Sequence, residues 1–295
     1  MTTPTHAPAA TDARTTYLTA PRDRGGWHWW RAVVAILLAI LVLSAVPLLV
    51  ATVATNAGFA DHRDSPDYAW QITVRNFGAL VACLPLLLLI NRALNRLPTR
   101  AQLTGAPAWR WSLALKTLAV SVVAVTAYAV VWFVIEDRLH LDLEPRLGVI
   151  VLALVLLAPL QVLAEELLFR GMFLQGMVSA LGAAASRVAI SLLVTSLLFA
   201  LMHGAQSPEL WAARFGMALI YGYATWRANG LEVPWALHTA NNVVLLLFAA
   251  ATGSYVEMVQ ANSTTWTSTL LQFVALGAAC LVAVRLTTRR DVATA

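Results

Sequence analysis

Apolar residues along the chain form eight long stretches separated by short polar segments. Each stretch holds about 18 to 22 residues, the length that a helix needs to cross about 30 Å of hydrocarbon. The predicted membrane helices cover residues 33–53, 76–93, 113–135, 148–170, 186–203, 211–228, 234–252 and 267–286, and the apolar pattern of the fourth continues to residue 178. The pattern therefore predicts an all-α fold, a polytopic integral membrane bundle of about eight transmembrane helices.

Charge is distributed unevenly between the polar segments. Short cytoplasmic loops of membrane proteins collect Arg and Lys, so the arginine-rich side is predicted to be cytoplasmic. One set of segments carries Arg14, Arg22, Arg24, Arg31, Arg92, Arg96, Arg100, Arg110, Arg285, Arg289 and Arg290. The segments on the opposite side are acidic, with Asp61, Asp64, Asp67, Glu136, Asp137, Asp142 and Glu144. We therefore predict that both termini are cytoplasmic.

Composition supports the membrane location and excludes other classes of protein. Hydrophobic residues make up 59% of the 295 residues and charged residues 12%, a balance that soluble domains of this size do not show. The net charge of +5 follows from the loop arginines, so we predict no binding to nucleic acid. Arginine outnumbers lysine nineteen to one, which favours a bacterial genome. The predicted location is a bacterial plasma membrane, with the lipid bilayer as a partner.

Polar side chains inside the apolar stretches mark the place of any chemistry. A charged residue near the centre of a bilayer costs about 2.5 to 3.5 kcal/mol on insertion scales and is rarely kept without a function. Facing lipid, such groups would lack hydrogen-bond partners. We predict that the fourth, fifth and seventh helices bring their polar groups together in a shared interior. These groups are Glu165, Glu166, Arg170, His203, His238, Asn241 and Asn242.

Helical spacing distinguishes the two adjacent glutamates. Residues four apart lie on one face of a helix, so Glu166 and Arg170 can form an ion pair, and we assign both a supporting role. Glu165 lies on another face and needs a partner from another helix, for which His203 is the candidate. Phe199, four residues before His203, is predicted to pack beside it and shape the pocket.

The same groups meet the requirements of amide hydrolysis. This reaction needs a base that activates water, a group that positions the water, and hydrogen-bond donors for the oxyanion. We assign Glu165 as the base and His203 as the group that holds the water and later helps to protonate the leaving amine. His238 can supply an oxyanion donor together with Asn242, four residues on, or with Asn241, three residues on.

At these positions the sequence resembles the CAAX protease and bacteriocin-processing family, the CPBP or Abi family, which includes the type II CAAX prenyl endopeptidases. The resemblance covers residues 147–252. It implies a glutamate-dependent intramembrane endopeptidase in which the first glutamate and the first histidine activate water. It also implies an oxyanion hole made by the second histidine and Asn242, which selects Asn242 over Asn241. The motifs EExxxR, FxxxH and HxxxN match Glu165, Glu166 and Arg170, then Phe199 and His203, then His238 and Asn242.

The chain divides into four predicted regions. Residues 1–30 are rich in Thr, Ala and Pro and are predicted to form a disordered cytoplasmic tail. Residues 31–146 hold the N-terminal membrane helices, and residues 147–252 hold the catalytic core. Residues 253–295 hold the last membrane helix and the cytoplasmic C-terminus.

Other functions stay open as alternatives. A zinc-dependent protease would use Glu165, His203 and His238 as ligands, but the HExxH spacing is absent and Arg170 engages Glu166, so we predict no metal and no cofactor. A proton-coupled transporter would place polar groups in two related halves, whereas here they occupy one half. A bacteriocin-immunity or binding protein without proteolytic activity would keep the same fold. The strings GxSxG and GxGD of serine and aspartyl intramembrane proteases do not occur.

The predicted substrate is a peptide or a segment of a membrane protein. We expect it to reach the site from the cytoplasmic side, because Glu165 lies near the predicted cytoplasmic end of its helix.

Overall fold

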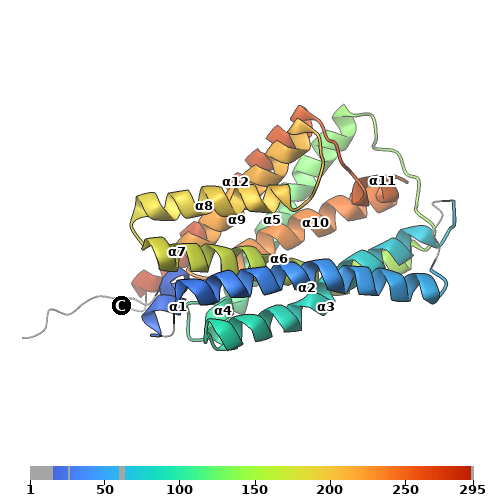
Figure 1. The fold of residues 1–295 in the computed structure, drawn as a ribbon. Helices are drawn as coiled ribbons and strands as arrows, with labels where there is room; N and C mark the ends of the chain where they lie inside the picture. Colours follow the sequence, from blue (N-terminus) through green and yellow to red (C-terminus); the bar gives the residue numbers. More distant parts are fainter. Residues whose placement is uncertain (1–15, 26, 60–63, 294–295) are drawn as a thin grey trace, which may run out of the picture.

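The computed structural model describes residues 16–25, 27–59 and 64–293, and this part of the chain is helical apart from loops and two isolated β-bridges (Figure 1). The predicted all-α membrane bundle is confirmed, because each of the eight apolar stretches overlaps a long helix. The long helices are α2 (Trp29–Asn56), α3 (Tyr68–Leu94), α5 (Trp111–Ile135), α6 (Leu147–Leu168), α8 (Ala185–Leu201), α9 (Pro208–Ala228), α10 (Glu232–Ala251) and α12 (Trp266–Ala293). The short helices are η1 (Tyr17–Thr19), α1 (Ala20–Asp23), α4 (Thr99–Leu103), η2 (Phe169–Leu174), α7 (Gln175–Leu181) and α11 (Tyr255–Val259).

Six helical segments within the described ranges are long and apolar enough to cross a membrane. They are α2, α3, α5, the run from α6 to α7, α10 and α12. The helix α8 is apolar but has 17 residues, and α9 carries Glu209, Arg214 and Arg227. A multi-pass membrane protein is therefore confirmed, whereas the number of eight crossings stays a prediction.

The fourth apolar stretch forms one helical run from Leu147 to Leu181. The run begins as α6, passes through the π-helical segment η2 and ends as α7, so its predicted continuation to residue 178 is confirmed. Glu165 lies in the middle of this run. The prediction that Glu165 lies near the end of its helix is wrong, because the helix continues past Arg170 through η2 and α7. The π-helical segment η2 follows Glu165 closely, and π-helical turns occur frequently at functional sites.

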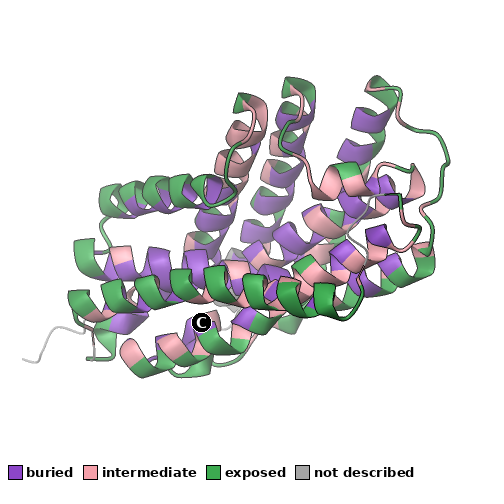
Figure 2. Cartoon of the chain, turned by 45° about the vertical axis from the view of Figure 1, so that its right-hand side comes forward, coloured by how far each residue is buried: buried purple, intermediate pink, exposed green. Residues whose placement is uncertain are grey.

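The central helix of the bundle is α10, which packs against α5, α6, α9 and α12. Figure 2 shows buried residues on the faces that the helices turn toward one another and exposed residues on their outer faces. The helix α2 lies at the periphery, where Leu37, Leu41 and Leu48 are exposed. Exposed leucines of this kind contact lipid tails in a bilayer, so the outer surface of the bundle suits a membrane.

The loops gather at two ends of the bundle, as the charge pattern predicts. At one end the Tyr17 hydroxyl donates a hydrogen bond to the Gln102 carbonyl, and Thr104 forms a β-bridge with Gly230. The opposite end holds the acidic loops, where Asp67 pairs with Arg146 at 3.1 Å. The arginine-rich and acidic segments therefore lie at different ends. Which end faces the cytoplasm stays a prediction, and reporter fusions to the 136–146 loop measure it directly.

The N-terminal segment differs from its prediction. Residues 1–15 of the predicted disordered tail lie outside the described residues, but residues 17–23 form η1 and α1, and α2 begins at Trp29. Tyr17 is fully buried, and its carbonyl oxygen accepts a hydrogen bond from Gln175 Nε2 at 2.7 Å. The prediction of disorder is wrong here because Tyr17 and Leu18 pack against residues distant in the sequence, which local composition does not reveal.

Candidate active site

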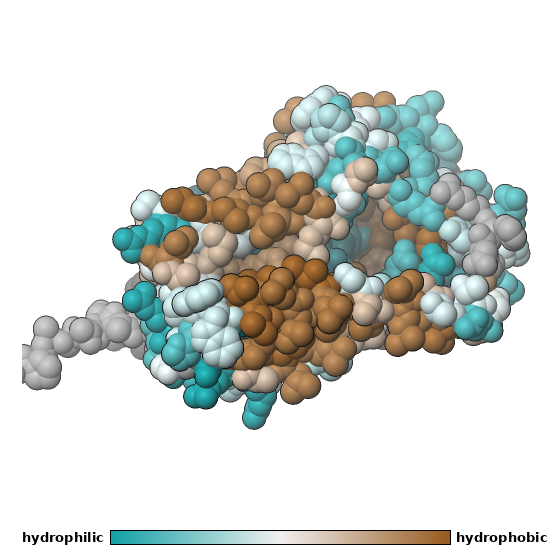
Figure 3. Space-filling view, in the orientation of Figure 1, coloured by the Kyte–Doolittle hydropathy of each residue, from teal (hydrophilic) through white to brown (hydrophobic). Residues whose placement is uncertain are grey.

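One cavity of about 650 Å³ collects the polar residues of the three helices. Glu165 of α6, His203 after α8, and His238 of α10 all line it. Asn241 and Asn242, also on α10, contribute to the same wall. Figure 3 shows a hollow with both hydrophilic and hydrophobic residues around it, beside the hydrophobic patch in the middle of this face. The predicted convergence on a shared interior is therefore present, while the catalytic roles of these residues stay predictions.

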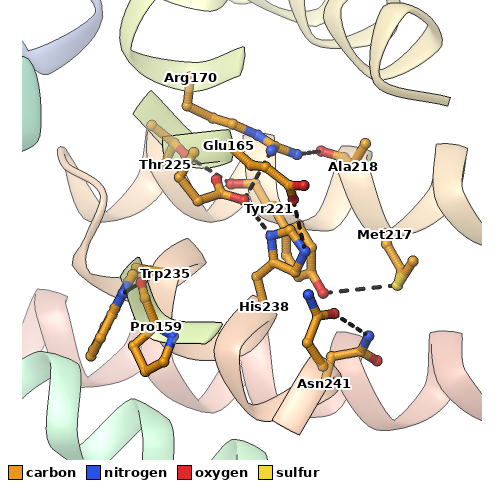
Figure 4. Close-up of polar contacts among 12 residues, drawn as sticks. Pro159, Glu165, Arg170, Met217, Ala218, Tyr221, Thr225, Trp235, His238 and Asn241 are labelled. Atoms are coloured by element: carbon orange, nitrogen blue, oxygen red, sulfur yellow. Dashed lines mark hydrogen bonds and ion pairs between the residues drawn. The ribbon is translucent and has the colours of Figure 1, made fainter. Parts of the chain in front are cut away.

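The predicted ion pair within α6 and η2 lies directly beside the cavity. Arg170 donates from one terminal nitrogen to Glu166 Oε1 at 2.9 Å, and both side chains are buried. The other terminal nitrogen of Arg170 donates to the Ala218 carbonyl of α9 at 3.0 Å (Figure 4). The guanidinium also lies over the rings of Phe199 and Tyr221, at 5.2 and 5.5 Å from their centroids. The buried guanidinium of Arg170 thus connects α6, α8 and α9.

His238 bridges the two adjacent glutamates. Its Nδ1 lies 2.9 Å from Glu166 Oε1, and its Nε2 lies 3.5 Å from Glu165 Oε2 (Figure 4). Its ring stacks on Tyr221 with the centroids 4.8 Å apart. Because Glu166 and Tyr221 hold the ring, Nε2 is directed toward Glu165 and the cavity.

The predicted pairing of Glu165 with His203 is wrong in this structure, where the contact of Glu165 is His238. The reason is the packing of α10 on α6, which Trp235 fixes by donating from Nε1 to the Pro159 carbonyl at 2.8 Å. His203 lies in the turn that follows α8, and its Nδ1 lies 2.7 Å from the Phe199 carbonyl. A carbonyl oxygen only accepts, so Nδ1 carries the proton of the neutral ring and Nε2 keeps a lone pair.

The amide groups of α10 form a short hydrogen-bonded chain. Gln272 of α12 donates to Asn241 Oδ1 at 2.9 Å, and Asn241 Nδ2 donates to Asn242 Oδ1 at 3.2 Å. These two bonds orient the Asn242 amide, and its nitrogen forms no hydrogen bond among the described residues. Asn242 therefore keeps its N–H donors for another group, whereas Asn241 is partly occupied as a support.

Sequence reasoning missed several polar residues of the cavity, among them Gln161, Arg214 and Gln272. Gln161 is buried one helical turn before Glu165, and its Oε1 has no hydrogen-bond partner in the described part of the chain. The signal was available for Gln161, because it lies four residues from Glu165 in an apolar stretch. Gln272 gave a weaker signal, since it lies in the last apolar stretch, outside the three motifs.

The residues named as alternative zinc ligands are not gathered as a metal site. Among residues 16–25, 27–59 and 64–293, no group of three or more His, Cys, Asp and Glu side chains is arranged to hold a metal ion. Glu165 and His238 are neighbours, whereas His203 is turned to the Phe199 carbonyl. The absence of a metal requirement nevertheless stays a prediction.

The cavity extends toward the acidic end of the bundle. Its wall there includes Arg138 and Glu257, which form a partly exposed ion pair at 2.6 Å, together with Glu136 and Thr265. The N-terminal segment with Tyr17 lies at the other end. The part of the cavity wall that holds these residues therefore lies at the end opposite the N-terminal segment, while the orientation of the termini and the side from which the substrate enters stay predictions.

Replacing Glu166 with glutamine is expected to act mainly on stability. The change leaves Arg170 buried without a carboxylate, and removing one partner of a buried pair costs about 3 to 5 kcal/mol. We expect a clearly lower midpoint of thermal unfolding in detergent. Glu257→Gln is the control, because its pair with Arg138 is exposed and exposed pairs contribute about 0 to 1 kcal/mol. An unchanged midpoint in Glu166→Gln would contradict the supporting role.

Comparison with protein families identifies the region that holds the site. Residues 147–244 match the model of the family described as type II CAAX prenyl endopeptidase Rce1-like. The match runs from the start of α6 into α10 and contains every residue of the three motifs. No curated protein and no solved structure matched the chain. Residues 147–244 are therefore similar to the Rce1-like type II CAAX prenyl endopeptidases, the group of membrane endopeptidases that the three motifs also resemble.

Proposed function

We propose that the protein is a glutamate-dependent intramembrane endopeptidase that hydrolyses a peptide bond of a membrane-associated protein or peptide. One observation carries this proposal: a single cavity gathers a carboxylate, two imidazoles and an amide with free N–H donors, contributed by Glu165, His203, His238 and Asn242. These are the groups that amide hydrolysis requires. A cavity of about 650 Å³ falls within the range of about 300 to 1,000 Å³ that is usual for ligand sites.

Glu165 is the proposed general base. Its side chain is 17% exposed and so reaches the cavity, whereas Glu166 is fully buried and engaged by Arg170. His203 offers Nε2 as an acceptor, because Nδ1 is held by the Phe199 carbonyl. A water molecule between Glu165 and His203 would give its proton to the carboxylate as its oxygen attacks the carbonyl carbon of the peptide.

His238 and Asn242 are the proposed donors to the oxyanion. The amide N–H groups of Asn242 have no acceptor in the described part of the chain, and His238 directs Nε2 toward the cavity. Donation from Nε2 requires a proton there in addition to the proton that Nδ1 shares with Glu166. Glu166 Oε1 lies 2.9 Å from Nδ1 and Glu165 Oε2 lies 3.5 Å from Nε2, so each ring nitrogen faces a carboxylate oxygen.

Replacing Asn242 with alanine is expected to lower kcat by about 10² to 10³, the usual loss for one oxyanion donor. The fold should persist, because Asn242 is only half-buried. The measurement is steady-state cleavage of a peptide by the purified protein in detergent. Asn76→Ala is the matched control, because Asn76 lines the cavity from α3 and forms no hydrogen bond with the α10 amides among the described residues. Equal kcat values for both variants would contradict the assignment of Asn242.

The natural substrate can be sought in cells. We expect the membrane proteome of a deletion strain to lack specific peptide termini that are present in the wild type and return with the wild-type gene. An identical set of termini in both strains would oppose proteolysis and favour a binding or immunity role.

A further inference from the structure

A charged residue outside the three motifs lies in the same cavity. Arg214 of α9 is half-buried and lines the cavity together with Glu165 and His203. One terminal nitrogen of its guanidinium donates to Gln206 Oε1 at 2.6 Å, and the other donates to the Ala261 carbonyl at 3.4 Å. Both acceptors are neutral, so these bonds fix the position of the guanidinium without neutralising its charge.

Other arginines at the core or around the cavity have a carboxylate partner. Arg110 pairs with Glu232 at 2.8 Å, Arg138 with Glu257 at 2.6 Å, and Arg170 with Glu166 at 2.9 Å. Among the described residues, no Asp or Glu oxygen lies within 4.0 Å of the Arg214 guanidinium. Removing a cation from water is costly unless an anion compensates it. Glu165 interacts with this charge without forming an ion pair, so an anion of a molecule that enters the cavity can become the ion-pair partner of Arg214.

Hydrogen bonds around Arg214 fix the position of its guanidinium in the cavity. Gln206 is itself anchored, because its Nε2 donates to the Ala200 carbonyl at the end of α8 at 2.8 Å. The loop after α8 is joined to the loop before α12 by the bond from the Ser207 N–H to the Asn262 carbonyl at 2.7 Å. A guanidinium has five N–H donors, and the two contacts leave further donors directed to other positions. Two neighbouring N–H groups match the two oxygens of a carboxylate.

We propose that Arg214 binds a carboxylate of the substrate peptide and thereby sets which peptide bond lies beside Glu165. The carboxylate is either the C-terminal group of the peptide or the side chain of an Asp or Glu residue. This inference rests on the proposed endopeptidase function and adds a determinant of specificity to it. Arg214 also interacts electrostatically with Glu165 without forming an ion pair, so an effect on the base itself must be separated from recognition of the substrate.

The test uses the full-length protein in detergent as wild type, Arg214→Gln and Arg214→Lys. Matched peptides carry a free C-terminus or a C-terminal amide, each with an internal Asp or Asn. In the wild type we expect kcat/KM to be about tenfold to a hundredfold higher for the peptides with the recognised carboxylate, the usual gain from charge-assisted hydrogen bonds. Arg214→Gln should abolish this preference, so that the variant gives similar kcat/KM values for peptides with and without the recognised carboxylate. Arg214→Lys should restore part of the preference.

The four peptides also identify the source of the carboxylate. A preference that follows the C-terminus assigns the terminal group, and one that follows the internal Asp assigns a side chain. Arg146→Gln is the control, because Arg146 is exposed at the acidic end and pairs with Asp67 outside the cavity. It should keep the wild-type preference.

The inference would be overturned if Arg214→Gln lowered cleavage of all peptides by the same factor, which is the signature of an effect on Glu165 or on folding. An unchanged preference in Arg214→Gln would overturn it as well. Binding of fluorescent versions of the peptides, measured by anisotropy, tests recognition without cleavage. If the wild type binds carboxylate peptides preferentially and Arg214→Gln removes this preference, the inference is supported even without cleavage. Absence of cleavage by the wild type would contradict only the proposed endopeptidase function.

Discussion

Replacing Glu165 with glutamine is expected to lower peptide cleavage by about 10² to 10⁴, the range typical of a general acid or base. Glutamine has nearly the same size and still accepts a hydrogen bond, but it does not take a proton from water at neutral pH. The side chain reaches the cavity and lies 3.5 Å from His238 Nε2, so the substitution removes the base without emptying the site. The measurement is kcat for a peptide with purified protein in detergent.

The control for Glu165→Gln is another carboxylate of the same cavity. Glu136 lines the wall at the acidic end and accepts a hydrogen bond from the Thr265 hydroxyl at 3.0 Å, so Glu136→Gln should retain activity. Thermal unfolding of both variants checks that the fold persists. Wild-type kcat in Glu165→Gln would sink the glutamate mechanism.

Replacing His203 with alanine is expected to lower kcat by a similar factor of about 10² to 10⁴. His203 is exposed in the turn after α8, so its removal should leave the midpoint of thermal unfolding nearly unchanged. His140→Ala is the matched control, because His140 is exposed in the loop after α5 and lies outside the cavity. Peptide cleavage and thermal unfolding are measured on both variants.

The result for His203 also distinguishes the two imidazoles. His238 is the imidazole that contacts Glu165, whereas His203 lines the same cavity without such a contact. Retained activity in His203→Ala would therefore contradict its role and move the positioning of water to His238. A loss in His203→Ala with an intact fold would support two separate roles for the two histidines.

The sequence predicts the membrane helices well because their length and apolar composition are local properties. The stretch predicted at residues 113–135, for example, coincides with α5 to within two residues at its start. The burial of Tyr17 against Gln175 and Gln102 was not predictable in this way, since it depends on residues far apart in the chain. The same reasoning explains why composition alone indicated a disordered tail.

In the candidate site too, contacts within one helix were predictable from the sequence, whereas contacts between helices were not. The pair of Glu166 with Arg170 follows from their spacing in one helix, and the structure shows it at 2.9 Å. The contact of Glu165 with His238 depends on how α10 packs on α6, which no spacing within a helix reveals. Arg214 gave no motif signal, and its lack of an ion-pair partner among the described residues becomes visible only when the neighbouring acceptors are known.

Peptide cleavage by the purified wild-type protein, before and after treatment with a chelator, tests the central claim most directly. We predict that the protein cleaves the peptide at the same rate in both states, because in the proposed mechanism Glu165 and His203 activate water without a catalytic metal. Loss of activity on chelation, with recovery on addition of zinc, would contradict this account and assign Glu165, His203 and His238 to a metal site.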